Sequence, residues 1–244
     1  MLAWFKERKY LHFDIPITAK SKSKTIEFVT DPNNISKHSF YPFITYNATK
    51  YKIREDEGTG KRFLDDTGVR PISYASHLDA QIYSYYSHQL SALYENRIKS
   101  LGLSETVIAF RKLKDKKTGD SKSNIHLARD AFDAIKEIGN CKVYAFDIKS
   151  FFDNLNPIVL KQKWEKVLNT KRLPDDHFSV YKSVTKFSVV TKDELYDLFK
   201  IPKNYREKGI FRICNPDEFR NHVRGEKAEF IDNSGNEKKR TNSD

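Results

Sequence analysis

The chain has 244 residues, of which 38% are hydrophobic and 13% aromatic, so it can build a folded core and is too apolar for an intrinsically disordered protein. Its 44 lysines and arginines exceed its 33 aspartates and glutamates, and the net charge of +11 favours a polyanion such as nucleic acid as partner, although charge alone also fits a merely soluble basic protein. Two cysteines are too few for a disulfide framework. The sequence has no apolar leader and no apolar run of about 18 residues, which predicts a cytoplasmic protein without a membrane partner.

The first third of the chain carries strand-type patterns. Alternating apolar residues from Leu11 to Ile17 predict one strand, and Ile26 with Phe28 suggests a second. Residues 51–54 and 62–64, separated by the glycine-containing stretch 57–61, predict a β-hairpin. Its basic side chains are candidates for contacts to a nucleic-acid backbone, with an ordinary exposed hairpin as the alternative: Lys50, Lys52, Arg54, Lys61 and Arg62.

The middle of the chain is predicted to be mainly helical. Ser76 followed by Asp79 resembles a capping box, and an apolar face then continues to Ile98 before a stop at Gly102. Alternation over residues 106–113 predicts a strand. A second helix is expected over residues 123–138, with Gly139 at its end.

The last third is predicted to contain one strand, at residues 143–148, and several short helices. The helix that begins near Pro174 is expected to continue to Phe187. Residues that favour caps and first turns predict four helix starts: Asn156-Pro157, Pro174, Thr191 with Glu194, and Asn215-Pro216. The segment after Asp232 has no apolar residue, and we expect it to be frayed.

The predicted strand at residues 143–148 carries a carboxylate, Asp147, near its end. A buried carboxylate is costly unless a cation meets it, and carboxylate oxygens on a rigid strand suit Mg²⁺. The backbone carbonyl of Ile148 is a further candidate ligand. Asp153 and Asn154 fit a turn before the next helix, and a helix cap is the alternative role for Asp147.

The ten residues Phe146-Asp-Ile-Lys-Ser-Phe-Phe-Asp-Asn-Leu155 resemble motif A of reverse transcriptases. Four upstream segments resemble the fingers of the same family, closest to abortive-infection and defence-associated bacterial types: Arg70–His77, Tyr94-Glu95, Val107–Arg111 and Asn124–Ala128. Together the resemblance covers residues 50 to 190, in the order that the family has.

This resemblance implies an α+β fold, with helix-rich fingers and a partial palm sheet of the right-hand polymerase type. Residues 1–140 would be an N-terminal extension and fingers, residues 141–231 a partial palm, and residues 232–244 a polar tail. It implies an RNA-directed DNA polymerase of an anti-phage defence system, which uses two Mg²⁺ or Mn²⁺ ions and takes template, primer and deoxynucleotides as partners.

The resemblance also implies roles for individual residues. Asp147 would be the catalytic metal ligand, assisted by the carbonyl of Ile148. Phe152 would lie under the sugar of the incoming deoxynucleotide, where a bulky ring excludes a 2′-hydroxyl. Arg111 and Lys122 are the candidates for contacts to the triphosphate.

The second carboxylate motif of the family, aromatic-x-Asp-Asp downstream of motif A, is missing from the sequence. Phe63-Leu-Asp-Asp66 precedes motif A and belongs to the hairpin, and Leu173-Pro-Asp-Asp176 is typical of a helix cap. None of the three glutamines is followed by glycine, so the Gln-Gly element of the family is missing too.

We therefore expect the fingers and the first part of the palm, truncated before the second carboxylate motif and inactive as a polymerase without a C-terminal half or partner subunit. Two other functions stay open. One is a non-catalytic protein that keeps the fingers scaffold and binds nucleic acid or a partner. The other is a metal-dependent nuclease that uses Asp147 and Asp153.

Overall fold

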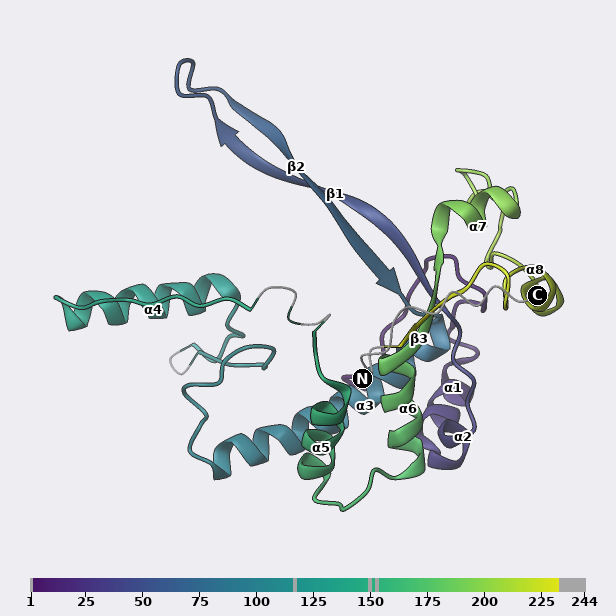
Figure 1. Cartoon of the computed structure of the whole chain (residues 1–244), viewed down its shortest axis with the longest axis horizontal. Coiled ribbons are helices and arrows are strands. Elements are labelled where there is room, and N and C mark those ends of the chain that lie inside the picture. The colour runs from purple at the N-terminus through teal and green to yellow at the C-terminus, as the bar shows by residue number, and fades with distance from the viewer. Residues whose placement is uncertain (1, 116–117, 149–150, 152–153, 233–244) are drawn as a thin grey trace. The chain divides into compact units, whose positions relative to one another are not determined.

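The protein has a mixed α+β fold in the computed structural model, which describes residues 2–115, 118–148, 151 and 154–232 (Figure 1). Its elements in chain order are α1 (Lys22–Thr30), α2 (Pro32–Ser36), β1 (Phe43–Glu55), β2 (Arg62–Tyr74), α3 (His77–Ser100), α4 (Asn124–Ile138), α5 (Pro157–Leu168), α6 (Asp175–Thr185), β3 (Lys186–Thr191), α7 (Lys192–Leu198), α8 (Pro216–His222) and β4 (Glu229–Asp232).

Two compact units divide the chain. Residues 1–88 and 156–244 form one, which we call the terminal unit, and residues 89–155 form the other, the central unit. The division differs from the expected boundary between residues 140 and 141, because contacts join the first 88 residues to the segment that begins at residue 156.

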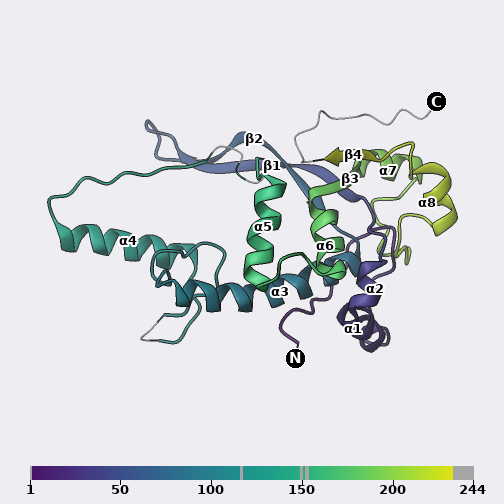
Figure 2. The ribbon, with the colours of Figure 1, turned by 60° about the horizontal axis from the view of Figure 1, so that its bottom comes forward.

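The sheet lies in the terminal unit and has the strand order β2-β1-β3-β4. β1 pairs antiparallel with β2 from Ile44↔Tyr74 to Glu55↔Arg62, with an irregularity between Thr49 and Tyr51. β3 runs parallel to β1 over three residues only, and β4 pairs antiparallel with β3 (Figure 2). The predicted hairpin is thus confirmed, but its strands of 13 residues each are longer than predicted.

Two apolar clusters form the core of the terminal unit. The first joins the segment after Tyr10 to β1, β3, α7 and the region of α8: Leu11, Phe13, Ile44, Val190, Leu195, Ile213, Cys214 and Val223. The second joins the N-terminal segment to α1, α2, α3 and α6: Trp4, Val29, Ile35, Ile82, Tyr86 and Val180. Burial of such side chains is the main stabilising contribution to folding.

The predicted helix starts are confirmed where a local cap satisfies the first free amides. The side chain of Asn156 accepts from the backbone N–H groups of the first turn of α5, and Asn215 does the same for α8. Ser123 and His126 form a capping box at α4, and Gly139 follows with φ +77°. Pro174 precedes α6 as expected, but the helix ends at Thr185 and residues 186–191 form β3.

Four strand predictions are wrong. Leu11 and Phe13 are buried, yet residues 11–17 form no strand, and Ile26 and Phe28 lie in helix α1. Residues 106–113 form turns, and residues 141–148 have no regular structure. Alternation indicates two different faces of a segment, whereas a strand also needs a neighbouring strand to pair with, and none of these four segments belongs to a sheet among the described residues.

Candidate functional site

Asp147 lies on a segment, residues 141–148, that is exposed throughout. Tyr144 and Phe146 are expected to point into a packed core, but they do not. Phe146 is 91% exposed, and Tyr144 stacks on Phe146, with the ring centroids 6.5 Å apart. Ile148 is exposed as well. Among the described residues, no surrounding packing therefore fixes the direction of the Asp147 carboxylate.

A two-ion centre needs several oxygen ligands, with carboxylates bridging or flanking the ions. Within the described ranges, no three His, Cys, Asp or Glu side chains gather in a way that could hold a metal ion. Asp147 and the carbonyl of Ile148 alone do not fit such a centre. Phe152 and Asp153, the predicted sugar platform and the alternative nuclease residue, lie outside the described residues.

Arg111 is engaged by protein groups of the central unit. Its Nε and Nη2 donate to the two carboxylate oxygens of Glu95 at 2.8 and 2.7 Å. Its Nη1 donates to the carbonyl oxygens of Ser104, at 2.8 Å, and Val107. The hydrogen bonds from Arg111 lower the pKa of Glu95, and those to Glu95 raise the pKa of Arg111. A triphosphate would have to displace Glu95 to reach this guanidinium.

Lys122, the second triphosphate candidate, is also paired. Its Nζ lies 2.5 Å from Oδ2 of Asp130 on α4, and this hydrogen bond raises the pKa of Lys122. Both residues predicted to bind the triphosphate, Arg111 and Lys122, are therefore paired with carboxylates of the protein itself.

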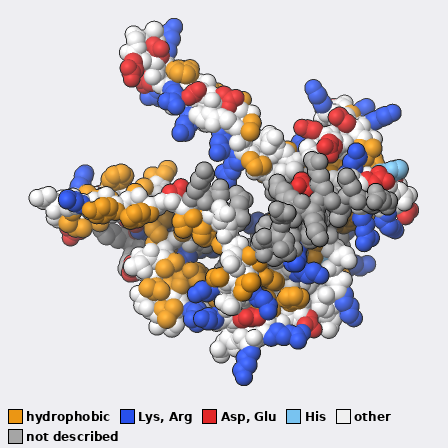
Figure 3. All heavy atoms as spheres, viewed as in Figure 1, with side chains coloured by type: hydrophobic (Ala, Val, Ile, Leu, Met, Phe, Trp, Pro, Cys, Tyr) orange, Lys and Arg blue, Asp and Glu red, His pale blue; other side chains and the backbone are white. Residues whose placement is uncertain are grey.

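The predicted nucleic-acid residues of the hairpin separate onto different faces. Side chains alternate along a strand, and residues opposite each other across the ladder share a face. Lys50, Lys52 and Arg54 therefore share one face of β1, and Arg70 joins them opposite Ala48. The other face carries Asp66 opposite Tyr51 and the facing residues Glu55 and Arg62 near the tip, together with four exposed apolar side chains: Tyr51, Ile53, Leu64 and Val69. Figure 3 shows basic and hydrophobic side chains side by side along this hairpin.

Some of these basic side chains are neutralised locally. Arg54 pairs with Asp65, and Arg62 pairs with Glu55 at 3.5 Å on the opposite face. Lys50, Lys52 and Lys61 form no ion pair with any described residue, and all three are exposed. Within the described part of the chain, the hairpin thus presents unpaired positive charge through Lys50 and Lys52, whose backbone positions are about 6.8 Å apart along β1, and also through Arg70 and Lys61.

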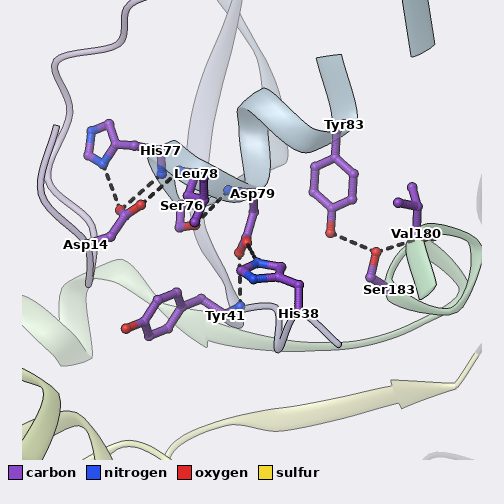
Figure 4. Close-up of polar contacts among 10 residues, drawn as sticks. All are labelled: Asp14, His38, Tyr41, Ser76, His77, Leu78, Asp79, Tyr83, Val180 and Ser183. Atoms are coloured by element: carbon purple, nitrogen blue, oxygen red, sulfur yellow. Dashed lines mark hydrogen bonds and ion pairs between the residues drawn. The ribbon is translucent and has the colours of Figure 1, made fainter. Parts of the chain in front are cut away.

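A buried polar network lies at the start of α3 in the terminal unit, and the sequence patterns predict only its contact between Ser76 and Asp79 (Figure 4). Asp14 accepts from the backbone N–H groups of His77, at 3.0 Å, and Leu78, at 2.9 Å, and pairs with Nδ1 of His77 at 2.7 Å. It thereby caps α3 from 63 residues away. Burial raises the pKa of Asp14, but the hydrogen bonds from the side chain and backbone of His77 and from the amide of Leu78 together outweigh burial. The net effect is a lowered pKa of Asp14.

Asp79, in the first turn of α3, holds a second part of this network. Its Oδ2 accepts from the backbone N–H of Tyr41 at 2.9 Å, and its Oδ1 lies 2.6 Å from Nε2 of His38. The N–H of Asp79 donates to Oγ of Ser76 at 3.2 Å, as the sequence predicts. Together these bonds attach the N-terminal end of α3 to the loop before β1.

The histidines identified in the sequence are structural or exposed, as expected. His77 and His177 are buried and hydrogen-bonded, His126 caps α4, and His88 is exposed. His12, which the sequence patterns do not single out, is fully buried, and burial lowers its pKa to about 4. It therefore stays neutral at physiological pH.

No protein-family model matches the chain, and a search of curated proteins returned no match. None of the helices in the described part of the chain combines the length and apolarity that a membrane crossing requires.

Proposed function

We propose that this chain is the fingers and first palm segment of an RNA-directed DNA polymerase of the reverse-transcriptase kind, from a bacterial anti-phage defence system. In this proposal it becomes catalytic only when a further polypeptide segment completes the palm. The observation that carries the proposal is the run of ten residues, Phe146–Leu155, that resembles motif A and follows a hairpin, a long helix and α4 in the family's order.

The exposed apolar surface of the central unit supports the need for a completing segment. Val143 and Tyr144, like Phe146 and Ile148, are exposed on a segment that pairs with no strand in the described part of the chain. α4 is strongly amphipathic yet has no buried residue, and Phe132 on it is 66% exposed. Apolar side chains on both sides of a strand are typical of a strand covered on both faces. Strands paired with residues 143–148 would satisfy their backbone groups, and elements packed on the two faces of that sheet would cover these side chains and orient Asp147.

The proposed roles follow the resemblance. Asp147 and the carbonyl of Ile148 would supply part of the metal site, and the completing segment would supply the second carboxylate cluster. Phe152 would select the sugar. Arg111 and Lys122 would bind the triphosphate once Glu95 and Asp130 release them.

The test is incorporation of labelled deoxynucleotides on a primed RNA template with Mg²⁺ or Mn²⁺. The chain alone is expected to incorporate none, and the chain produced with the polypeptide encoded directly downstream is expected to be active. Asp147→Asn should abolish that activity, whereas Asp153→Asn, the matched control six positions later in the sequence, should retain it. Activity of the chain alone, or activity that survives Asp147→Asn, would refute the proposal.

A non-catalytic nucleic-acid-binding function is the second candidate, and the unpaired Lys50 and Lys52 on one hairpin face favour it. Its test is RNA binding as a function of salt. Removing two phosphate contacts in Lys50→Gln/Lys52→Gln should reduce the slope of log affinity against log salt by about 1.4. Binding that shows this reduction, together with no incorporation by any combination of segments, would favour this candidate over the polymerase.

A further inference from the structure

A cleft of about 1120 Å³ opens in the terminal unit between α2, the loop before β1, β3 and α8. It includes none of the residues proposed for polymerase activity. Four cationic residues from three regions of the chain line it: Lys37, Lys186, Arg220 and Arg224. No carboxylate is among the described residues that line it, so the local charge is strongly positive.

A second cleft, of about 630 Å³, adjoins the first and shares with it Lys37, Phe40 and Lys186. It adds Lys182 and Phe178, both on α6. Its one lining carboxylate, Asp175, already pairs with Arg172 at 3.0 Å. Because the two clefts share lining residues, they are together called the basic cleft; its lining includes residues of α6, of the loop before β1 and of the segment after α8.

Several cations of the basic cleft are available to a ligand. Lys37, Lys182 and Arg224 are exposed and form no ion pair with any described residue. Arg220 pairs only with Asp217, at 3.3 Å, and both side chains are exposed. Because such exposed pairs are weak, Arg220 can exchange its partner for a phosphate at little cost.

Aromatic rings line the basic cleft together with these cations. Phe28, Phe40, Tyr41, Phe187 and Phe219 line the larger cleft and are half-buried. Phe178 in the smaller cleft is 44% exposed. Rings that are anchored on one side and open on the other offer a surface on which bases can stack, and cations between them match the phosphates.

We propose that the basic cleft, from Phe178 and Lys182 to Arg224, binds single-stranded nucleic acid. An acidic protein would use the cations but has no need of the open rings. A small anion would fill little of a space that exceeds the volume of ordinary ligand pockets. None of residues 141–155 is among the residues that line this cleft, so the proposal stands whether or not the chain belongs to a polymerase.

The first experiment measures the charge contribution. The full chain binds a fluorescently labelled oligouridylate of about 12 nucleotides, within the usual length range of such sites, in EDTA without deoxynucleotides. Lys37→Gln/Arg224→Gln should weaken binding about tenfold and reduce the slope of log affinity against log salt by about 1.4, because two phosphate contacts are lost. Lys203→Gln/Lys208→Gln removes the same charge from exposed positions outside the cleft and should keep the wild-type slope.

The second experiment measures stacking. Phe178→Ala removes a ring that is already largely exposed, so the fold should persist, which circular dichroism checks. Affinity should fall about tenfold, without a change in the salt slope, because base stacking and not a charge is lost. A labelled glutamate-rich peptide of similar length should bind at least tenfold more weakly than the oligonucleotide.

Three results would overturn the proposal. One is an equal loss of affinity in the two charge variants, which would indicate attraction by net charge alone. Another is unchanged affinity in Phe178→Ala. The third is equal binding of the acidic peptide, which would make the cleft a site for acidic proteins. Because no metal ion or deoxynucleotide is present, none of these results depends on polymerisation.

Discussion

The terminal and central units have similar apolar content in their helices but bury it very differently. The terminal unit packs two apolar clusters, whereas Ile98 is the one buried hydrophobic residue among the described residues of the central unit. α4 is the more strongly amphipathic of the two helices α3 and α4, yet Ile125 on α4 is 80% exposed, whereas Ile82 on α3 is fully buried. The comparison teaches that an amphipathic pattern is enough to form a helix, but stability comes only where a second surface covers the apolar face.

The largest expected effect is that of a core truncation in the terminal unit. Ile82→Ala removes a fully buried side chain from the cluster that contains Val29 and Ile35, so it should lower the free energy of unfolding by about 2–5 kcal/mol. Urea unfolding measures this. Ile125→Ala on α4 is the matched control and should change stability by less than about 0.5 kcal/mol. Equal losses would contradict the contrast between the units.

The second prediction concerns acid sensitivity of the terminal unit. Burial lowers the pKa of His12 to about 4, so between pH 6.5 and 4 the unfolded chain binds a proton that the folded protein does not. Stability should therefore fall as pH is lowered through this window, by about 3 kcal/mol in total. Unfolding at pH 7 and at pH 4.5 measures most of this loss.

His12→Asn should remove this part of the pH dependence, and His88→Asn, which changes an exposed histidine, should retain it. The same pH dependence in both variants would show that His12 does not cause it.

A smaller, local effect is expected in the central unit. Arg111→Gln breaks the bidentate pair with Glu95 and the bonds to the carbonyls of Ser104 and Val107. Amide hydrogens of residues 103–107 and of the last turn of α3 should then exchange faster, with no change in the terminal unit. Arg111→Lys should show an intermediate effect, because an ammonium cannot bind both carboxylate oxygens in the same geometry. Unchanged exchange in Arg111→Gln would show that this pair does not hold the segment.

The smallest effect on stability is expected on the exposed face of α4. Phe132→Ser should change the free energy of unfolding by less than about 0.5 kcal/mol, because the side chain is already 66% exposed. It should, however, reduce binding of an apolar fluorescent dye, because it removes part of an exposed hydrophobic surface. A destabilisation above about 2 kcal/mol would mean that this face is covered in solution.

The helix starts are predictable from sequence because the interactions that define them are local. Asn156 and Asn215 bond to amides two and three residues ahead, and proline in the first turn needs no amide partner. Strands are less predictable because their partners are distant in sequence. Val190 of β3, for example, lies directly opposite Ile44 of β1. The hairpin is the exception, because its two strands are joined by a short turn.

The candidate sites likewise divide into those formed by neighbouring residues, which the sequence reveals, and those formed by distant residues, which it does not. The run around Asp147 is recognisable from its order of residues alone, and so are the basic positions of the hairpin. The cap that Asp14 forms on α3 joins residues 63 positions apart, and the basic cleft joins α2, β3 and α8. No periodicity or spacing relates such residues, so they become visible only when the chain is folded.

By itself the sequence determined the helix starts that have local caps, the hairpin, the positive charge and the position of the motif-like carboxylate, because each is encoded in neighbouring residues. Only the tertiary structure decided which apolar faces are buried, which cations are paired and where cations and rings meet in one cleft. The physical reason is that burial and charge neutralisation depend on contacts between distant segments, and local patterns leave those contacts open.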